Sequence, residues 1–342
     1  MKTMKSKFYS LALAAGMLTL TACSDDNTND SNNDKGNGIE NGSTLKGTIT
    51  EDVTLKAGNT YKLSGEYIVE AGATLNIEEG VKIISIYDNI VDYILVKQGA
   101  KINAVGTPDK PIVMTSEKEE PGAWGGIHIC GKAHTNAEGG KGSSEIGGAV
   151  YGGNDDADNS GTLQYIRLEY TGFAFDEEHE ANGISFYGVG NGTIVDHCEA
   201  YKGSDDGFEF FGGSVNVSNM VVVSCSDDSF DWTEGWNGKG TDLVAYQEAK
   251  ATLGYDCDCL IEADNNENDN AATPVSHPVL KNLILAGNGE SKQGIRLRRG
   301  TQADIDNAKV CGKGQPLVVE SALTNAALKN GTSKLTNMTV TA

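Results

Sequence analysis

Basic residues are scarce in this chain of 342 residues. It has 27 Lys and Arg against 48 Asp and Glu, so the formal net charge is −21. Binding to nucleic acid is not expected, because neutralising the phosphates needs clustered Lys and Arg. Electrostatic docking on anionic lipid is disfavoured for the same reason.

Proline and aromatic residues are scarce as well. There are 6 Pro and 7% aromatic residues, whereas Gly reaches 43. This balance is typical of short strands joined by tight turns rather than of helices. Hydrophobic residues still make up 38%, which is enough for a core and excludes disorder of the whole chain.

The apolar run near the start is too short to span a bilayer, which needs about 20 residues. It extends from Phe8 to Leu20 after three lysines, as in a secretory signal peptide. The run ends in Leu20-Thr-Ala-Cys23, which resembles the lipobox of bacterial lipoproteins. We therefore expect residues 1–22 to be removed and Cys23 to be acylated, which anchors the protein in a lipid bilayer. An ordinary secretory signal cut near Ala22 is the alternative.

The segment after this cysteine is polar, and Ile39 is the only aliphatic residue between positions 24 and 43. Residues 23–43 are therefore predicted to be the acylated cysteine and a disordered tether. Cys23-Ser-Asp-Asp26 resembles the acidic tag that sends some Gram-negative lipoproteins to the cell surface. The predicted location is the outer membrane, exposed at the cell surface, and a linker facing the periplasm is the alternative.

Two alternating patterns repeat through the rest of the chain. The first, apolar-polar-x-apolar-polar-apolar, begins at Val195 and returns at Val217, and it appears again at Leu280 and Ile305. The second, Gly or Ser followed by apolar-x-apolar, interleaves with the first, for example at Gly207. Both have the period of two that is typical of strands.

Short strands that repeat about every 22–25 residues predict an all-β solenoid. A β-propeller would need longer blades with a recurring signature, and a β-sandwich would not repeat at a fixed period. The periodicity, with Trp124-Gly-Gly-Ile-His-Ile129, resembles right-handed parallel β-helix proteins of the pectate-lyase-like superfamily, among them bacterial surface lipoproteins. This fold is expected over residues 44–342, with an insertion around 247–277 where the repeat is broken.

Asn recurs at one equivalent position of the repeat, at 219, 282, 307 and 337. These amides either line a sugar site or form a ladder at a bend. The ladder is favoured, because Asn tolerates turn conformations and bonds to nearby backbone groups. Tyr165 and His197 occupy the same position and are predicted to be bend residues.

An acidic turn recurs one coil apart, first as Ser204-Asp-Asp-Gly-Phe-Glu-Phe210 and then as Ser226-Asp-Asp-Ser-Phe-Asp-Trp232. Stacked coils lie about 4.8 Å apart. Equivalent carboxylates at that distance repel by roughly 3 kcal/mol at an effective dielectric of 20. The stacked pairs are therefore costly unless another interaction compensates them.

Three arrangements would relieve the repulsion. The Asp side chains can accept backbone N–H bonds in the turns and point apart. Some carboxyl groups can stay protonated, as in acid–base catalysis. A Ca²⁺ ion can also bind, since it takes about six to eight oxygen ligands. The predicted metal ligands are Asp205, Asp206, Asp227 and Asp228.

Strand alternation also predicts an outward face. The apolar residues on either side of Glu209 and Asp231 should point into the core, so these two carboxylates should point outward, as should Arg296. A sugar chain would suit this face, and the predicted ligand-binding residues are His128, Tyr187, Phe211 and Trp236. The other interpretation is a solvated sheet face of mixed charge.

Polysaccharide lyases and polygalacturonases share the architecture that the chain resembles. The resemblance implies outward acidic or basic catalytic groups, for which Glu209, Asp231 and Arg296 are the candidates. Ser204-Asp-Asp-Gly207 is loosely similar to the Gly-Asp-Asp segment of polygalacturonases. Their Asn-Thr-Asp, Gly-His-Gly and Arg-Ile-Lys motifs are absent.

Seven cysteines leave six in the exported body once Cys23 carries lipid. Disulfides are expected in an exported protein, although Cys130, Cys198 and Cys225 can equally be buried in the stack. Cys257 and Cys259 have no metal-binding partners at zinc-finger spacing.

The sequence thus predicts a surface β-helix that binds glycan or another ligand without catalysis, with calcium as its only candidate cofactor. One alternative is a polysaccharide lyase or glycoside hydrolase acting on acidic polysaccharide. The other is a structural or adhesive surface protein.

Overall fold

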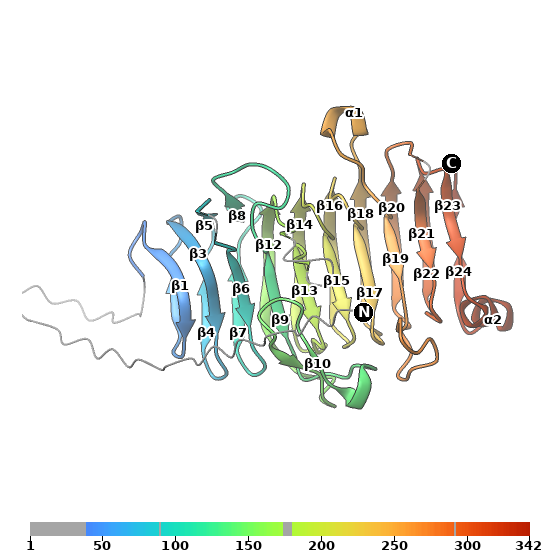
Figure 1. The fold of residues 1–342 in the computed structure, drawn as a ribbon, viewed down its shortest axis with the longest axis horizontal. Coiled ribbons are helices and arrows are strands. Elements are labelled where there is room, and N and C mark those ends of the chain that lie inside the picture. Colours follow the sequence, from blue (N-terminus) through green and yellow to red (C-terminus); the bar gives the residue numbers. More distant parts are fainter. Residues whose placement is uncertain (1–38, 89, 174–179, 291) are drawn as a thin grey trace, which may run out of the picture. The chain divides into compact units, whose positions relative to one another are not determined.

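Successive coils of the chain pair in parallel and build a right-handed parallel β-helix, as predicted (Figure 1). The computed structural model describes residues 39–88, 90–173, 180–290 and 292–342. The chain divides into two units, 1–36 and 37–342. The predicted signal peptide 1–22, Cys23 and the tether up to residue 38 lie outside the described residues.

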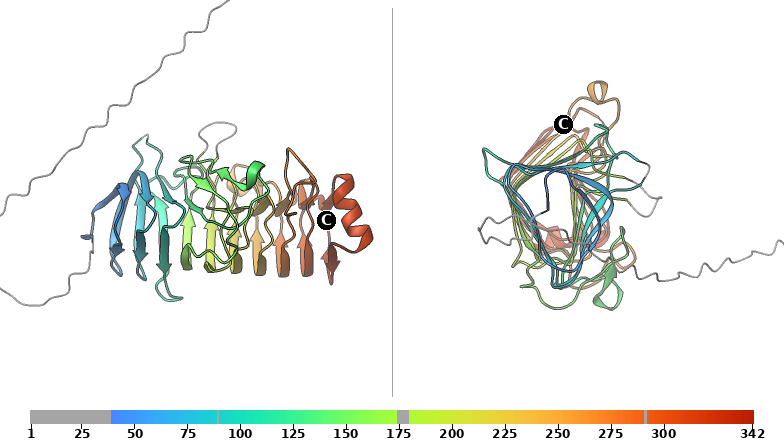
Figure 2. Two further views of the ribbon diagram at one scale, coloured as in Figure 1. Left: turned by 90° about the horizontal axis from the view of Figure 1, so that it is seen from below. Right: turned by 90° about the vertical axis from the view of Figure 1, so that its left-hand side faces the viewer.

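Each coil contributes short strands to three faces that surround one core (Figure 2). Across the described residues, twenty-three strands join into one sheet, and their pairing is parallel throughout. The first face holds the second halves of β1 (Thr44–Ile49) and β3 (Thr60–Val69), then β6 (Tyr93–Val96), β9 (Ile127–Cys130), β13 (Ile184–Tyr187), β15 (Phe208–Phe211), β17 (Phe230–Thr233), β19 (Ile261–Ala263), β21 (Gln293–Leu297) and β23 (Gln315–Val319).

The other two faces share long strands that bend in the middle. These are β12 (Gly161–Glu169), β14 (Ile194–Tyr201), β16 (Asn216–Val223), β18 (Lys239–Tyr246), β20 (Val279–Ala286) and β22 (Asp304–Cys311). In the N-terminal coils these two faces use the first halves of β1 and β3 together with β2 (Val53–Leu55), β4 (Thr74–Ile77), β5 (Lys82–Ser85), β7 (Lys101–Val105) and β8 (Ile112–Ser116), and in the last coil they use β24 (Lys334–Thr336) and β25 (Thr339–Val340).

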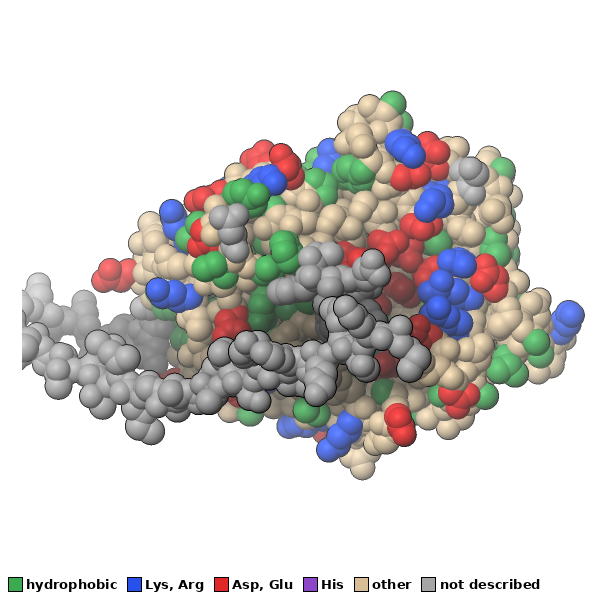
Figure 3. All heavy atoms as spheres, in the orientation of Figure 1, with side chains coloured by type: hydrophobic (Ala, Val, Ile, Leu, Met, Phe, Trp, Pro, Cys, Tyr) green, Lys and Arg blue, Asp and Glu red, His purple; other side chains and the backbone are tan. Residues whose placement is uncertain are grey.

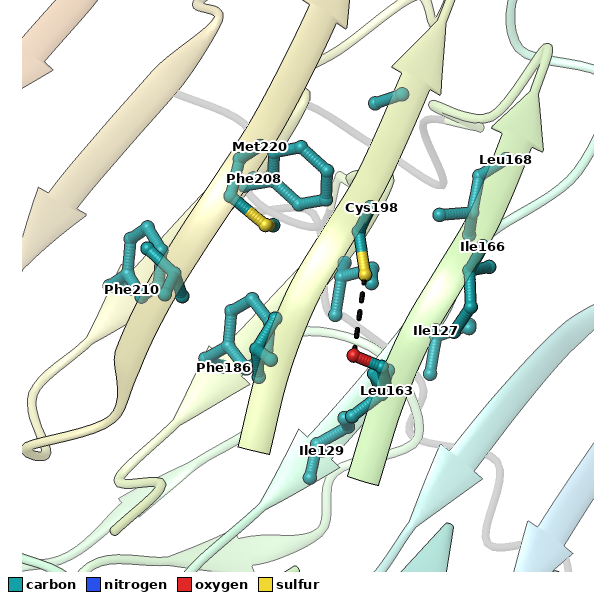
Figure 4. Close-up of a cluster of buried hydrophobic side chains, with 14 of the residues drawn as sticks. Ile127, Ile129, Leu163, Ile166, Leu168, Phe186, Cys198, Phe208, Phe210 and Met220 are labelled. Atoms are coloured by element: carbon teal, nitrogen blue, oxygen red, sulfur yellow. Dashed lines mark hydrogen bonds between the residues drawn. The ribbon is translucent and has the colours of Figure 1, made fainter. Parts of the chain in front are cut away.

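The core consists of inward side chains that stack from coil to coil, because alternate residues of a strand face opposite sides. Phe186 stacks on Phe210 with ring centroids 5.1 Å apart, and Phe210 stacks on Trp236 at 4.1 Å. Figure 4 shows part of this cluster, with the Cys198 thiol directed at the Leu163 carbonyl oxygen at 3.7 Å. The hydrophobic residues therefore form a core, as their share of the composition predicted.

The bends of the long strands confirm the predicted Asn ladder in part. Asn219, Asn282 and Asn337 donate to an Asp of the preceding coil rather than to another Asn. Asn219, Asn282 and Asn307 all have left-handed backbone angles, with φ of 53°, 60° and 59°. The Asn307 amide donates to Asn282 Oδ1 at 2.9 Å. Tyr165 and His197 occupy the same bend and stack with ring centroids 4.4 Å apart.

Loops between the strands make the coils unequal in length. Glu209 pairs with Asp231 after one short coil, whereas His128 pairs with Ser185 after a much longer one. That difference comes from a long excursion over residues 131–160. It contains the 3-10 helix η1 (Glu138–Gly140) and a hairpin of β10 (Gly142–Ser143) and β11 (Val150–Tyr151).

The predicted insertion at 247–277 is two loops separated by the strand β19. The first loop carries the helix α1 (Lys250–Leu253). A second helix, α2 (Ala322–Asn330), begins where the Ser321 hydroxyl accepts the Thr324 N–H, and it ends at Gly331 with φ of 81°. Among the described residues, no helix has the length and apolar character of a membrane span.

The six described cysteines are unpaired. Cys130, Cys198, Cys225, Cys257 and Cys259 are buried and Cys311 is exposed. The expectation of disulfides is therefore not met, and the alternative that the first three are buried in the stack is confirmed. Their thiols fill small spaces in the core, as buried cysteines commonly do.

Candidate functional site

One outward-facing column of the first face is acidic over three successive coils. The register pairs Glu209 with Asp231 and Asp231 with Glu262. Phe210 and Trp232, which follow the first two of these acids along their strands, are buried. The predicted stacking of Glu209 on Asp231 is confirmed, and Glu262 extends it by one coil.

Two acidic turns lie beside this column, one coil apart. The Asp228 N–H donates to Asp206 Oδ1 at 2.8 Å, and the Cys259 N–H donates to Asp228 Oδ1 at 2.6 Å. The Asp206 N–H donates to Asp205 Oδ1 at 3.0 Å. The expectation that these carboxylates accept backbone N–H bonds is thus confirmed for Asp205, Asp206 and Asp228, and these bonds fix where the side chains point.

The acidic column and the turns line a cleft of about 620 Å³. Figure 3 shows acidic side chains gathered in a hollow of this face, next to a group of basic side chains. A smaller extension of about 280 Å³ adds Phe211, Thr233, Arg298 and Arg299 to the lining. The main cleft is lined by Glu145, Glu180, Asn182, Asp205, Asp206, Glu209, Asp227, Asp228, Asp231, Glu262 and Glu267.

Basic side chains neutralise only the C-terminal end of the cleft. Arg296 pairs with Glu262 at 2.9 Å, and Arg298 and Arg299 pair with Asp264 at 2.7 and 2.8 Å. Over the described ranges, no ion pair reaches the acids of the preceding coils. These uncompensated acids are Asp205, Asp206, Glu209, Asp228 and Asp231.

Burial raises the pKa of these uncompensated carboxyl groups. The pKa of Asp205 rises to about 9, mainly because of burial and then because of Glu180 and Asp227. Burial likewise raises the pKa of Asp206, Asp228, Glu209 and Asp231 well above the usual range, and neighbouring carboxylates add to the effect. The site therefore favours protonated carboxyl groups or a bound cation over bare negative charges.

Glu209 and Asp231 differ in their hydrogen bonds. Glu209 Oε2 accepts from Asn182 Nδ2 at 2.6 Å, which favours the ionised form. Asp231 Oδ1 is buried and has no hydrogen-bond partner, which disfavours the charged form. Two stacked carboxyl groups are thus held in unlike environments.

Several of the carboxylates are close enough to share one cation. Single oxygens of Asp206, Asp227 and Asp228 lie within 4.8 Å of one another, and so do those of Glu180, Asp205 and Asp227. The four predicted metal ligands therefore fall into two groups that share Asp227, one with Asp205 and the other with Asp206 and Asp228. The oxygen-only ligand set suits a hard cation such as Ca²⁺.

Comparison with known proteins agrees with this architecture. Residues 47–342 match the model of the family described as "Pectate-lyase like beta helix domain". The chain belongs to this family. A solved structure, the Azotobacter vinelandii mannuronan C-5 epimerase AlgE6 A-module, is 12% identical with a TM-score of 0.32, over 78% of this chain and 69% of that one. That likeness is too distant to carry an argument about function. No curated protein matches the sequence.

The pectate-lyase-like domain does not present the predicted aromatic sugar face. His128 and Tyr187 have no exposed surface and Trp236 has 1%. The excursion 131–160 covers Tyr187, in a second apolar cluster with Ile146 and Tyr151, and His128 is enclosed beside the rings of Tyr93 and Tyr187. Their prediction as exposed ligand-binding residues is wrong, because a coil's outward side is buried where a loop folds over it.

Trp236 was also predicted to be an exposed ligand-binding residue, but it is buried for a different reason. It turns into the main core, where its indole N–H donates to the Val215 carbonyl oxygen at 3.1 Å. Phe211 stacks on Tyr187 at 4.4 Å and is 7% exposed, yet it lines the extension of the cleft. Arg296 does face outward, but Glu262 and Glu320 already hold its guanidinium.

The sequence reasoning missed Glu145, Glu180, Asn182 and Glu262 as cleft residues. For Asn182 and Glu262, the sequence around the residue matches the repeat and could have identified it. Asn182 precedes Gly183 as Asp206 precedes Gly207, and Ile261-Glu-Ala263 repeats the apolar-acid-apolar order of Phe208-Glu-Phe210. Glu145 comes from the excursion 131–160, for which the repeat gives no position.

Stability should fall with rising pH when divalent cations are removed. Carboxyl pKa values raised above their unfolded values stabilise the fold at low pH, and the stabilisation is lost as pH rises, for Asp205 through about 9. The free energy of unfolding in EDTA, from urea titrations, should therefore decrease between about pH 6.5 and 8. This window avoids His128, whose pKa burial lowers to about 4.

Asp205→Asn should reduce that slope and stabilise the protein by roughly 1–2 kcal/mol at the upper end of the window. Asp109→Asn, in an exposed turn, is the matched control and should leave the slope unchanged. If the free energy of unfolding of the parent protein does not change over this pH range, the buried carboxyl groups do not destabilise the fold as they ionise.

Proposed function

We propose that the protein binds carbohydrate in the acidic cleft and that a Ca²⁺ ion held by Asp205, Asp206, Asp227 and Asp228 is part of this site. One observation carries the proposal: stacked carboxylates line a cleft, and among the described residues no cation forms an ion pair with Asp205, Asp206, Glu209 or Asp228.

A bound cation would relieve the repulsion that the register imposes. Asp206 and Asp228 each hold a backbone N–H on one oxygen, so little side-chain entropy remains to be lost on binding. Asp227 is exposed, which gives an ion access from solvent. Calcium fits better than magnesium, because it tolerates irregular geometry and more oxygen ligands.

The carbohydrate part of the proposal is supported by the name of the family and by the polar lining. Carboxylate oxygens accept hydrogen bonds from sugar hydroxyls, and the Asn182 amide can both donate and accept. Phe211 and Thr233 add an apolar and a hydroxyl contact in the extension. A cation in an acidic cleft would also let a negatively charged sugar approach.

Calcium should raise the melting temperature and should be required for glycan binding. A cation at 100 times its dissociation constant adds about 2.7 kcal/mol. Protein stripped with EDTA should melt at a lower temperature and should lose signal on a glycan array, and calcium should restore both. Asp228→Asn should abolish both responses, whereas Asp109→Asn should keep them.

Two outcomes would separate the parts of this proposal. Glycan binding that survives EDTA would remove calcium but keep the carbohydrate site. A calcium response without any glycan signal would remove the carbohydrate and favour a structural role at the cell surface.

Hydrolysis or elimination of a polysaccharide is the second candidate function. It is favoured by the unlike environments of Glu209 and Asp231, since a general acid must stay protonated while its partner is ionised. In this mechanism Asp231 donates a proton. Glu209 acts as the base or nucleophile in its ionised form, which the Asn182 hydrogen bond favours and its burial opposes.

Turnover would be measured as reducing ends or as ultraviolet absorbance of unsaturated uronates. Asp231→Asn should abolish turnover while glycan binding remains, if the pair is catalytic. Binding without turnover in the parent protein would leave the binding function and reject catalysis.

The proposed location is the outer membrane surface, through acylated Cys23. The lipobox-like sequence and the polar tether support it. Cys23→Ala should move the protein from the membrane fraction to the soluble one, and intact cells carrying the parent protein should lose it to added protease. Protein that stays in the membrane fraction after Cys23→Ala would contradict the lipid anchor.

A further inference from the structure

The face formed by the second halves of the bent strands carries an apolar patch. Outward positions of a solvated sheet are normally polar, but three successive coils present apolar residues there. Tyr246 and Ile284 are 51% and 53% exposed. The patch consists of Val221 and Val223 on β16, Val244 and Tyr246 on β18, and Ile284 and Ala286 on β20.

Charged residues of opposite sign border the patch at its two ends. One outward column reads Glu199, Val221, Val244, Ile284, Lys309 along five successive coils. The Glu199 end is negative, because Glu199 and Glu169 share the single cation of Arg167. The other end is positive, because Lys309 is exposed there.

We propose that this patch is the interface of a two-fold symmetric dimer. A two-fold axis that runs along the strands through Val244 reverses the order of the coils in the second copy. Glu199 of one copy then lies opposite Lys309 of the other, and Val221 lies opposite Ile284. The same surface is complementary to itself, as a two-fold interface requires.

The opposite charges at the two ends of the patch fit a second copy of the chain in the reversed orientation. The formal net charge of −21 opposes contact between two copies over most of their surface, so an interface needs a face on which acids and bases are balanced. The cleft acids lie on the first face and in the turns next to it, whereas this column has one acid and one base at opposite ends. Association through this face leaves the cleft of each copy open, and two clefts per particle would increase avidity for a polymeric ligand.

Light scattering of the full chain carrying Cys23→Ala, which prevents acylation, tests the dimer. The expected mass is about twice the 36.0 kDa of one chain. Val244→Glu should give the monomer mass, because two carboxylates would meet at the axis. Val150→Glu, at an exposed residue of the excursion 131–160, is the matched control and should remain a dimer.

Cross-linking tests the arrangement. In a background with Cys311→Ser, Val244→Cys should give a covalent dimer under mild oxidation, because the two introduced thiols face each other across the axis. Ile194→Cys, at a more exposed position (52%) on the first half of β14, should not. A monomer at every concentration, a dimer that survives Val244→Glu, or equal cross-linking of both variants would overturn the proposal.

Discussion

Parallel pairing of successive coils places equivalent residues on top of one another, and the rest of the structure depends on this constraint. The hydrogen bonds between strands fix the spacing between coils. A residue type that repeats at one position therefore lies next to a residue of the same type in the next coil. For Phe186 and Phe210 the result is a stacked core, and for Asn282 and Asn307 it is a hydrogen bond between their side-chain amides. For the carboxylates of Glu209 and Asp231 the same spacing produces repulsion.

The protein compensates this repulsion at one end of the cleft only. After Glu262 the next coil supplies Arg296 in register, and Arg298 reaches both Glu262 and Asp264. One coil earlier no such cation follows among the described residues, although the backbone N–H groups of the turns stabilise one oxygen of Asp206 and of Asp228. The uncompensated acids are gathered along the cleft, and Asp205, Asp206 and Asp228 are buried there, so a bound cation is the simplest account of how they are stabilised.

The sequence correctly predicted the features that depend on the spacing between coils, which are the pairing of strands and the positions that face the core. The equal spacing of the two acidic turns was enough to pair Glu209 with Asp231 and to assign Phe208, Phe210, Phe230 and Trp232 to the core. The spacing could not predict where loops fold, since the sequence of the excursion 131–160 does not repeat. That loop covers Tyr187 and brings Glu145 to the cleft. Glu262 was missed because the loop that carries α1 separates it from the repeat, although its apolar neighbours keep the strand pattern.

The central claim is that a cation binds between the stacked carboxylates. Anomalous diffraction from crystals grown with a heavy calcium substitute would locate it directly. The account predicts a peak at coordination distance, about 2.3–2.6 Å for calcium, from oxygens of Asp206, Asp227 and Asp228. Crystals that diffract well at saturating cation but show no peak in the cleft would contradict it, and would mean that protonated carboxyl groups alone relieve the repulsion.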